Sequence, residues 1–264
     1  MGMLKDIWRY RHFVASSIRF ELATRFARSR LGGLWMIIHP LAQVLMYTLI
    51  LSAVLSAKLP GMEDTPFAYA IYLLSGILGW SLFSEVVSRC SRVFIEHAGM
   101  MKKMAFPGIC LPVIAMGSAL LNNMFLFIAG WGVFVILGHF PGVHLAWLPL
   151  VLTVNLVLAM GLGLLLGVIN VFVRDVGQLV DLALQYGFWF TPIVYMPHIL
   201  PEKFRALLQL NPLYWVVSAY HNALVFHRPP EWGGLLAVAL LAGFLLFLAL
   251  RLYSRAIQEM VDVL

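Results

Sequence analysis

The sequence predicts an all-α integral membrane protein with six transmembrane helices, an N-terminal amphipathic interface helix, and a re-entrant helix pair between spans five and six. Three observations predict it: an apolar composition, long windows without charge, and a one-sided placement of lysine and arginine. Of the 264 residues, 62% are apolar and 11% charged, and the mean hydropathy is +0.90. Soluble domains average about 25% charged residues, so this composition excludes an ordinary soluble enzyme.

The six spans follow from the charge-free windows, because a helix needs about 20 apolar residues to cross the hydrocarbon. One window, 104–173, is too long for a single span. The stretch LGHFPGVH at 137–144 divides it, since two glycines and a proline are a turn signal. The predicted spans lie near 34–57, 66–88, 108–137, 145–172, 177–196 and 233–252.

The segment 199–227 is too polar for a seventh span and is interrupted by proline at Pro201 and Pro212. We therefore expect two short gate helices that dip into the membrane and return. Non-helical backbone at membrane depth is tolerated only where protein or a water-filled cavity covers it. This segment is predicted to lie beside a translocation path.

Lysine and arginine predict the orientation, because cytoplasmic loops carry an excess of both. With six spans and a cytoplasmic N-terminus, four of the 18 lysines and arginines lie outside and the other fourteen inside. The four are Lys58, Lys203, Arg205 and Arg228. Both termini are therefore predicted to be cytoplasmic. The net charge of +6 indicates cations at a membrane face rather than a nucleic-acid partner.

Residues 1–30 form the predicted interface helix, and residues 31–264 the transmembrane domain. Apolar residues recur every three or four positions from 7 to 26, which is typical of a helix lying in the plane of the membrane surface. The cations Arg25, Arg28 and Arg30 at its end have two interpretations. They are an ordinary positive flank of the first span, or they bind a phosphate-bearing headgroup, whose oxygens suit arginine.

The loop after the second span holds a second polar cluster. A short helix is predicted near 95–104, ended by Pro107. It is either a solvated loop or a docking helix for a cytoplasmic partner. Its candidate contact residues are Glu96, His97, Lys102 and Lys103.

Catalytic signatures are missing from the sequence. It contains no P-loop, no H-E-x-x-H and no G-x-S-x-G motif, so we expect no catalytic residue, no metal site and no cofactor in this chain. The two cysteines give no disulfide framework, and the first thirty residues do not resemble a signal peptide. Asp181, near the start of span five, suits either a proton relay or a salt-bridged pair.

Aromatic residues are abundant, and five fall within 185–195. They are interpreted either as interfacial belts and ordinary packing, or as the lining of a sugar conduit, since aromatic faces stack on the apolar faces of sugar rings. The candidate channel aromatics are Trp80, Phe83, Phe188, Trp189, Tyr195, Tyr214 and Trp215.

Four segments resemble a known family in the same order along the chain. They are RFARSRLGGLWMIIHPLAQVLMYTLI, MMKKMAFPGICLPVI, VRDVGQLVDLALQYGFWFTPIVY and LNPLYWVVSAYHNALV. All four are similar to the permeases of type-2 ABC exporters of polysaccharide. The O-antigen (Wzm-like) branch is the closest, and capsule and teichoic-acid exporters come next.

The resemblance implies a homodimeric permease with two copies of a separate ATPase, which binds ATP and Mg. Its cargo would be a polysaccharide on an undecaprenyl-type pyrophosphate, moved from cytoplasm to periplasm across a bacterial inner membrane. It implies that the interface helix and the 95–104 helix contact the ATPase. It also implies that the Leu31–Gly32 turn lies by the entrance and that the helix pair after span five forms an outer gate.

Two other classes of function remain as alternatives. An ion-driven flippase of lipid-linked glycans would need no ATPase and would require Asp181. An intramembrane lipid-modifying enzyme would need a catalytic cluster at one membrane depth, and the sequence shows none.

Overall fold

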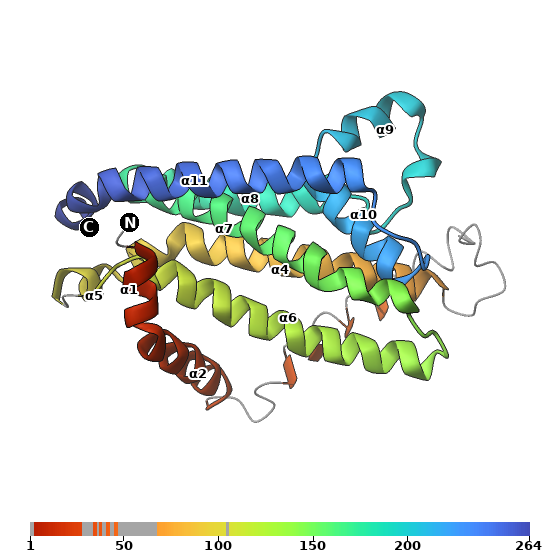
Figure 1. The fold of residues 1–264 in the computed structure, drawn as a ribbon, viewed down its shortest axis with the longest axis horizontal. Coiled ribbons are helices and arrows are strands. Elements are labelled where there is room, and N and C mark those ends of the chain that lie inside the picture. Colours follow the sequence, from red (N-terminus) through yellow and green to blue (C-terminus); the bar gives the residue numbers. More distant parts are fainter. Residues whose placement is uncertain are drawn as a thin grey trace.

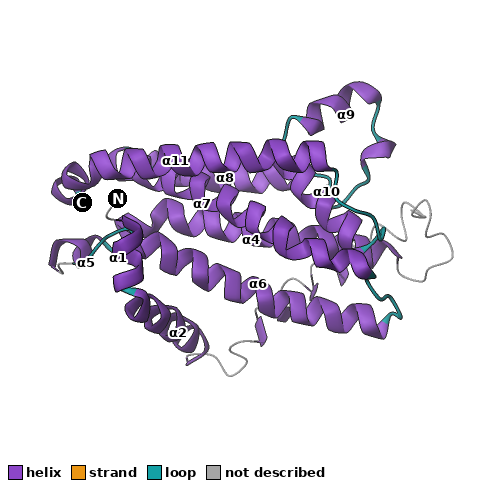
Figure 2. Cartoon of the chain, in the orientation of Figure 1, coloured by secondary structure: helices purple, strands orange, loops and turns teal. Residues whose placement is uncertain are grey.

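The computed structural model describes residues 3–27, 68–103 and 106–264, with four pairs of positions between 34 and 46. Within these residues every element is helical, which confirms the all-α prediction (Figure 2). The predicted first span at 34–57 falls almost wholly outside the described residues.

From α4 onward the helices follow one another along the chain with short connections (Figure 1). Their bounds are α1 Met3–Arg9, α2 Arg11–Ala27, α4 Ala68–Glu96, α5 Ala98–Lys103, α6 Cys110–Ile136, η2 Val143–Trp147, α7 Leu148–Phe172, α8 Asp175–Phe190, η3 Pro197–Ile199, α9 Glu202–Gln209, α10 Pro212–Leu224 and α11 Trp232–Val263.

Four of these segments are long and apolar enough to cross a membrane: Ala68–Glu96, Cys110–Ile136, Val143–Phe172 and Trp232–Val263. Helix α8, where span five is predicted, has 16 residues and is shorter than the others. The predicted gate segment holds η3 and the two short helices α9 and α10. The chain is thus a helical protein with at least four apolar helices of membrane-spanning length.

Helix α7 forms the centre of the bundle and packs against both α4 and α11 (Figure 1). Glycines make this close packing possible, since a Cβ at Gly161 would lie 2.7 Å from the backbone nitrogen of Leu246. A Cβ at Gly163 would lie 2.8 Å from the Cβ of Cys90. A Cβ at Gly167 would collide with the Cys90 carbonyl oxygen. Small residues four apart allow helix backbones to approach closely in membranes.

Buried amides add polar contacts between the same helices. Asn123 of α6 donates to the Leu78 carbonyl at 2.9 Å, and Asn155 of α7 donates to the Gly79 carbonyl at 2.8 Å. An unpaired amide is costly in an apolar interior, so these bonds favour one register of α6 and α7 against α4.

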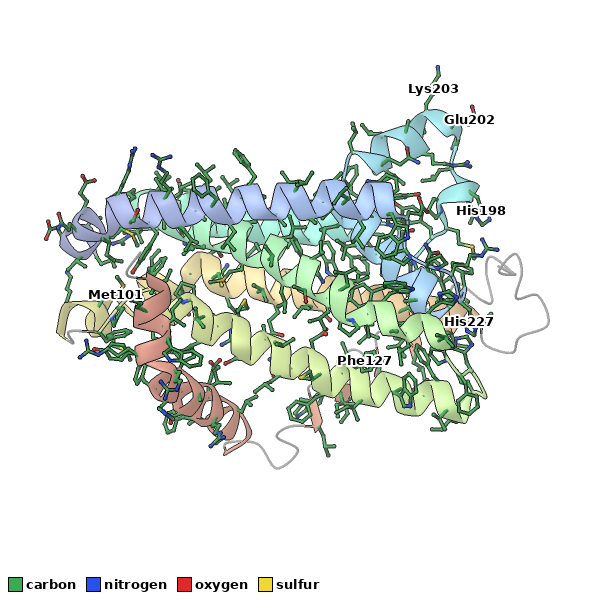
Figure 3. The ribbon with its side chains drawn as sticks, viewed as in Figure 1. Met101, Phe127, His198, Glu202, Lys203 and His227 are labelled. Atoms are coloured by element: carbon green, nitrogen blue, oxygen red, sulfur yellow. The ribbon has the colours of Figure 1, made fainter. Side chains whose placement is uncertain are left out.

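The bundle has two distinct ends. Helices α1 and α5 and the C-terminus lie at one end, which we call the α5 end (Figure 1). Helix α9 projects at the opposite end, with Glu202 and Lys203 at its tip, and His227 lies at this α9 end, far from Met101 (Figure 3). Helix α2 packs against the α5 end of α6.

Candidate functional site

The predicted coupling residues gather at the α5 end, where α4 changes direction. Glu96 is the last residue of α4, His97 forms the turn, and Lys102 and Lys103 close α5. The Nδ1 of His97 lies 2.9 Å from the carbonyl oxygen of Val93. Because a carbonyl oxygen only accepts, this contact requires Nδ1 to donate, and in the neutral ring Nε2 is then an acceptor.

About two helical turns before this corner, Arg89 of α4 takes part in a network that connects α2, α4 and α6. It pairs with Glu21 of α2 and lies 3.4 Å from Glu85 of its own helix. Two residues of α6 complete the network: Ser118 donates to Glu21 at 2.7 Å, and Asn122 donates to Glu85 at 2.5 Å. The interface helix is thereby tied to α4 and α6 by charge-assisted bonds, which are stronger than neutral ones.

Arg92 extends from α4 towards α8. It pairs with Asp181 and donates to the Gly177 carbonyl at 3.5 Å. Behind it, Asn170 of α7 donates to the Ser91 carbonyl at 2.8 Å and accepts from the Gly177 amide at 2.9 Å. Of the two interpretations of Asp181, the geometry supports a salt-bridged pair.

Glu85 is absent from the residues predicted above, although an acid inside a predicted span is itself a signal of function. The ion pair between Glu21 of α2 and Arg89 of α4 has no comparable signal in the sequence. Glu21 and Arg89 are 68 positions apart, and only the folded chain brings them together.

A cavity of about 590 Å³ opens between α2, α4, α5 and α6 at the α5 end. Glu21, Arg89, Glu96 and His97 all contribute to its lining. Two of the predicted coupling residues therefore face the interface helix across this cavity.

The predicted headgroup residues cannot be placed in the same way. Arg25 lies in α2, whereas Arg28, Arg30, Leu31 and Gly32 lie outside the described residues. Their role at an entrance stays a prediction.

Most of the predicted channel aromatics form one cluster between α4 and α8. The Trp80 ring lies 6.1 Å from Phe83 and 5.8 Å from Phe188, and Phe188 lies 5.6 Å from Trp189, centroid to centroid. The hydroxyl of Tyr195 donates to the Trp189 carbonyl at 2.9 Å. Trp80 and Phe83 also line an apolar cavity of about 460 Å³.

The other two candidate aromatics lie apart from this cluster, on α10. The rings of Tyr214 and Trp215 are 5.1 Å apart. Trp215 donates from its indole nitrogen to the Gln209 carbonyl at 2.9 Å and packs against Gly234 of α11. Whether any of the seven lines a channel stays a prediction.

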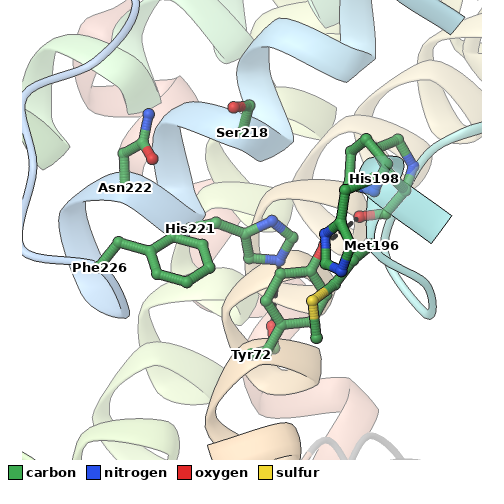
Figure 4. Close-up of a pocket in the computed structure, with 9 residues that line it drawn as sticks. Tyr72, Met196, His198, Ser218, His221, Asn222 and Phe226 are labelled. Atoms are coloured by element: carbon green, nitrogen blue, oxygen red, sulfur yellow. Dashed lines mark hydrogen bonds between the residues drawn. The ribbon is translucent and has the colours of Figure 1, made fainter. Parts of the chain in front are cut away.

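A small cavity of about 170 Å³ lies beside α10 at the α9 end (Figure 4). His221 stacks on Tyr72 with ring centroids 3.8 Å apart, and its Nε2 lies 3.1 Å from the Tyr72 carbonyl oxygen. The Tyr72 hydroxyl lies 3.2 Å and 3.1 Å from the carbonyl oxygens of Pro192 and Tyr195. These contacts fix α10 and the segment after α8 against α4, and they join residues that the sequence offers no way to pair.

Among the described side chains, no group of three or more His, Cys, Asp or Glu is arranged to hold a metal ion.

Comparison with known proteins assigns the chain to a family. The sequence model of the ABC-2 type transporter family matches residues 14–225, which is most of the chain. The chain belongs to the ABC-2 type transporter family. The match begins in α2 and runs through α10, so it includes most of α2, the α5 corner and nearly all of the gate segment.

Three relatives show where in the ABC-2 type transporter family the similarity is found. An O-antigen export system permease from Myxococcus xanthus is 27% identical over 266 residues, covering 98% of each chain. A Klebsiella pneumoniae protein of the same description is 26% identical and covers 76% of each. The polysialic acid transport protein KpsM of Escherichia coli is 24% identical over 91% of this chain and 92% of its own.

Proposed function

We propose that this chain is the permease subunit of an ATP-driven exporter that moves a lipid-linked polysaccharide, O-antigen in the first instance, from cytoplasm to periplasm. The observation that carries the proposal is the similarity to an O-antigen export permease over 98% of both chains. A similarity over nearly the whole length covers α2 and α5 as well as the spans, and these two helices are where a partner subunit would bind.

The proposed complex is a homodimer with two copies of a separate ATPase, which binds ATP and Mg. The α5 end is the cytoplasmic side of a bacterial inner membrane, with both termini on that side. The positive-inside distribution of lysine and arginine supports this orientation.

In this complex, α5 and α2 are the contacts with the ATPase. Closure of the ATPase pushes on α5, and the push reaches α2 and α6 through Arg89 and α8 through Arg92. The ion pairs of these two arginines with Glu21 and Asp181 support this route, because they join α5's neighbour α4 to helices on both sides. The cargo then passes between the two permeases, beside the aromatic cluster and the gate segment.

Co-purification is the direct test. The tagged permease is isolated from its native host, and its partners are identified. A P-loop ATPase in equal amount is expected, and a lysine-to-alanine change in that P-loop should stop export while both subunits are still made. Export by the purified permease alone, without nucleotide, would refute the proposal in favour of an ion-driven flippase.

A capsular or teichoic-acid cargo is the second candidate, and the similarity to KpsM supports the capsular form. Chemical analysis of the glycan that accumulates inside cells lacking this permease separates the two. O-antigen repeats on a polyprenyl pyrophosphate are expected, and capsular polymer would indicate the second candidate.

A further inference from the structure

The cavity beneath the interface helix has the size of a ligand site. Its volume of about 590 Å³ falls within the range of about 300–1,000 Å³ that small-molecule pockets occupy. Its lining comes from four helices, α2, α4, α5 and α6.

Beside the hydroxyls of Ser16, Ser17 and Thr24, which can donate or accept, the polar lining consists of Glu21, Arg89, Glu96 and His97. Arg89 is the arginine of this lining, and it is already engaged by Glu21 and Glu85. Glu96 has no ion pair with any side chain that the structure describes. In the neutral ring the Nε2 of His97 is an acceptor, because the other ring nitrogen donates to the Val93 carbonyl.

Apolar side chains make up much of the remaining wall. Phe13 and Phe20 line it from α2, and Leu111 and Ile114 from α6. Helix α2 also exposes 70% of Phe20 and pairs with a short helix that exposes 72% of Trp8. Exposed aromatics on a basic helix are typical of a helix at the membrane surface, so the cavity opens at the level of lipid headgroups.

We propose that this cavity binds one aminophospholipid of the cytoplasmic leaflet, with phosphatidylethanolamine as the occupant. Its ammonium group donates to Glu96 and to Nε2 of His97, and an acyl chain lies along the phenylalanines of α2. A primary ammonium has three donors and no acceptor, which matches a lining of carboxylate and imidazole acceptors. Phosphatidylglycerol carries the same phosphate but no ammonium, so its negative charge would lie near Glu21 and Glu96 with no cation of its own, while the nearby guanidinium of Arg89 is already paired.

This inference does not depend on which cargo the transporter moves. A cavity that prefers an ammonium group is not the site of the cargo's pyrophosphate. That anion would have to bind elsewhere at the α5 end, for instance at the arginines after α2.

Native mass spectrometry of the full chain in detergent tests the proposal. The purified permease is mixed with equal amounts of synthetic phosphatidylethanolamine and phosphatidylglycerol, and the adducts of each are compared. We expect phosphatidylethanolamine to be favoured about fivefold, the ratio that one partly exposed ion pair provides. Glu96→Gln should reduce this preference to about onefold, since the amide keeps the shape and loses the charge.

Two further variants locate the site. Glu259→Gln removes an exposed carboxylate from α11, at the same end but outside the cavity, and should retain the preference. Ser17→Phe fills the cavity from α2 and should remove the bound lipid of either kind. In the wild type, the proposal is overturned by the absence of any lipid adduct or by a phosphatidylglycerol adduct equal to or greater than that of phosphatidylethanolamine. It is also overturned if the preference survives Glu96→Gln or falls equally in Glu259→Gln. Lipid retained by Ser17→Phe would overturn it as well.

Discussion

Arg89 of α4 and Glu21 of α2 form an ion pair that attaches the interface helix to the transmembrane bundle. Glu85 approaches the same guanidinium, so two carboxylates share one arginine. Loss of the arginine and loss of one carboxylate should therefore have different consequences.

Arg89→Gln should destabilise the permease more than Glu21→Gln does. Without the guanidinium the two carboxylates face each other with no cation between them, which costs about 1–3 kcal/mol at a partly buried site. Glu21→Gln leaves Arg89 paired with Glu85 and should cost less than about 1 kcal/mol. Thermal unfolding in detergent, followed by size-exclusion chromatography, measures both, with Arg255→Gln on α11 as an exposed control. Equal losses from the two changes would contradict the shared-arginine geometry.

Asp181→Asn should lower export only in part if transport is driven by ATP, because Arg92 still donates to the Gly177 carbonyl of α8. The ion pair with Arg92 is exposed, at 39% for the arginine side chain and 51% for the aspartate, so its loss should cost less than about 1 kcal/mol. Export in cells is the measurement, with permease quantity checked in the membrane fraction. Abolished export at normal protein quantity would instead support an ion-driven flippase that carries protons on this carboxylate.

Gly167→Ala should destabilise the bundle, whereas Gly243→Ala should not. A Cβ at Gly167 would collide with the Cys90 carbonyl oxygen of α4, and overpacking of this kind costs about 1–3 kcal/mol. A Cβ at Gly243 meets nothing within 4 Å, so alanine there gains helix propensity only. Melting temperatures of the two variants should move in opposite directions. A similar decrease in both would mean that α4 and α7 are not in backbone contact.

Acid should weaken the fold through His227, in the connection between α10 and α11. Partial desolvation, and then the imidazoles of His139 and His144, lower the pKa of His227 from its ordinary 6.5. Below pH 6.5 the unfolded chain therefore binds more protons than the folded one. The stability that the neutral ring contributes is present above pH 6.5 and is lost as pH falls through the folded pKa.

His227→Asn should flatten this pH dependence between pH 7.5 and 5, as measured by melting temperature. Asparagine suits the positive φ of 53° at this position, so the backbone need not change. His12→Gln, an exposed histidine of α2, is the matched control and should retain the wild-type slope. A slope that is unchanged in His227→Asn, or one that is flattened equally in His12→Gln, would contradict the assignment.

The helical class was predictable because the hydrocarbon layer forces an apolar segment to satisfy its own backbone. The length of the helices was less predictable. The predicted second span ends at 88, yet α4 continues to Glu96, because Arg89 and Arg92 find carboxylate partners and need not leave the helix. Likewise α11 continues to Val263, since charge ends a membrane span but does not end a helix.

The parts of the candidate site were predictable only where neighbours in sequence are neighbours in space. Residues 96–103 lie together at one corner because they are consecutive, and Phe188 and Trp189 are consecutive in the same way. The pairing of Glu21 with Arg89, or of Tyr72 with His221, depends on contacts between segments far apart, for which a single sequence carries no signal. The spacing of Gly163 and Gly167 was a usable signal for close helix packing.

The glycine contacts of α7 also restrict how this protein can move. Helices whose backbones touch cannot slide past one another without collision, so α4, α7 and α11 must travel as a single rigid block. A movement that begins at the α5 end must therefore take place in helices outside this block. Helix α2, which is joined to that block through the Glu21–Arg89 pair and otherwise packs on α6, is the part freest to swing.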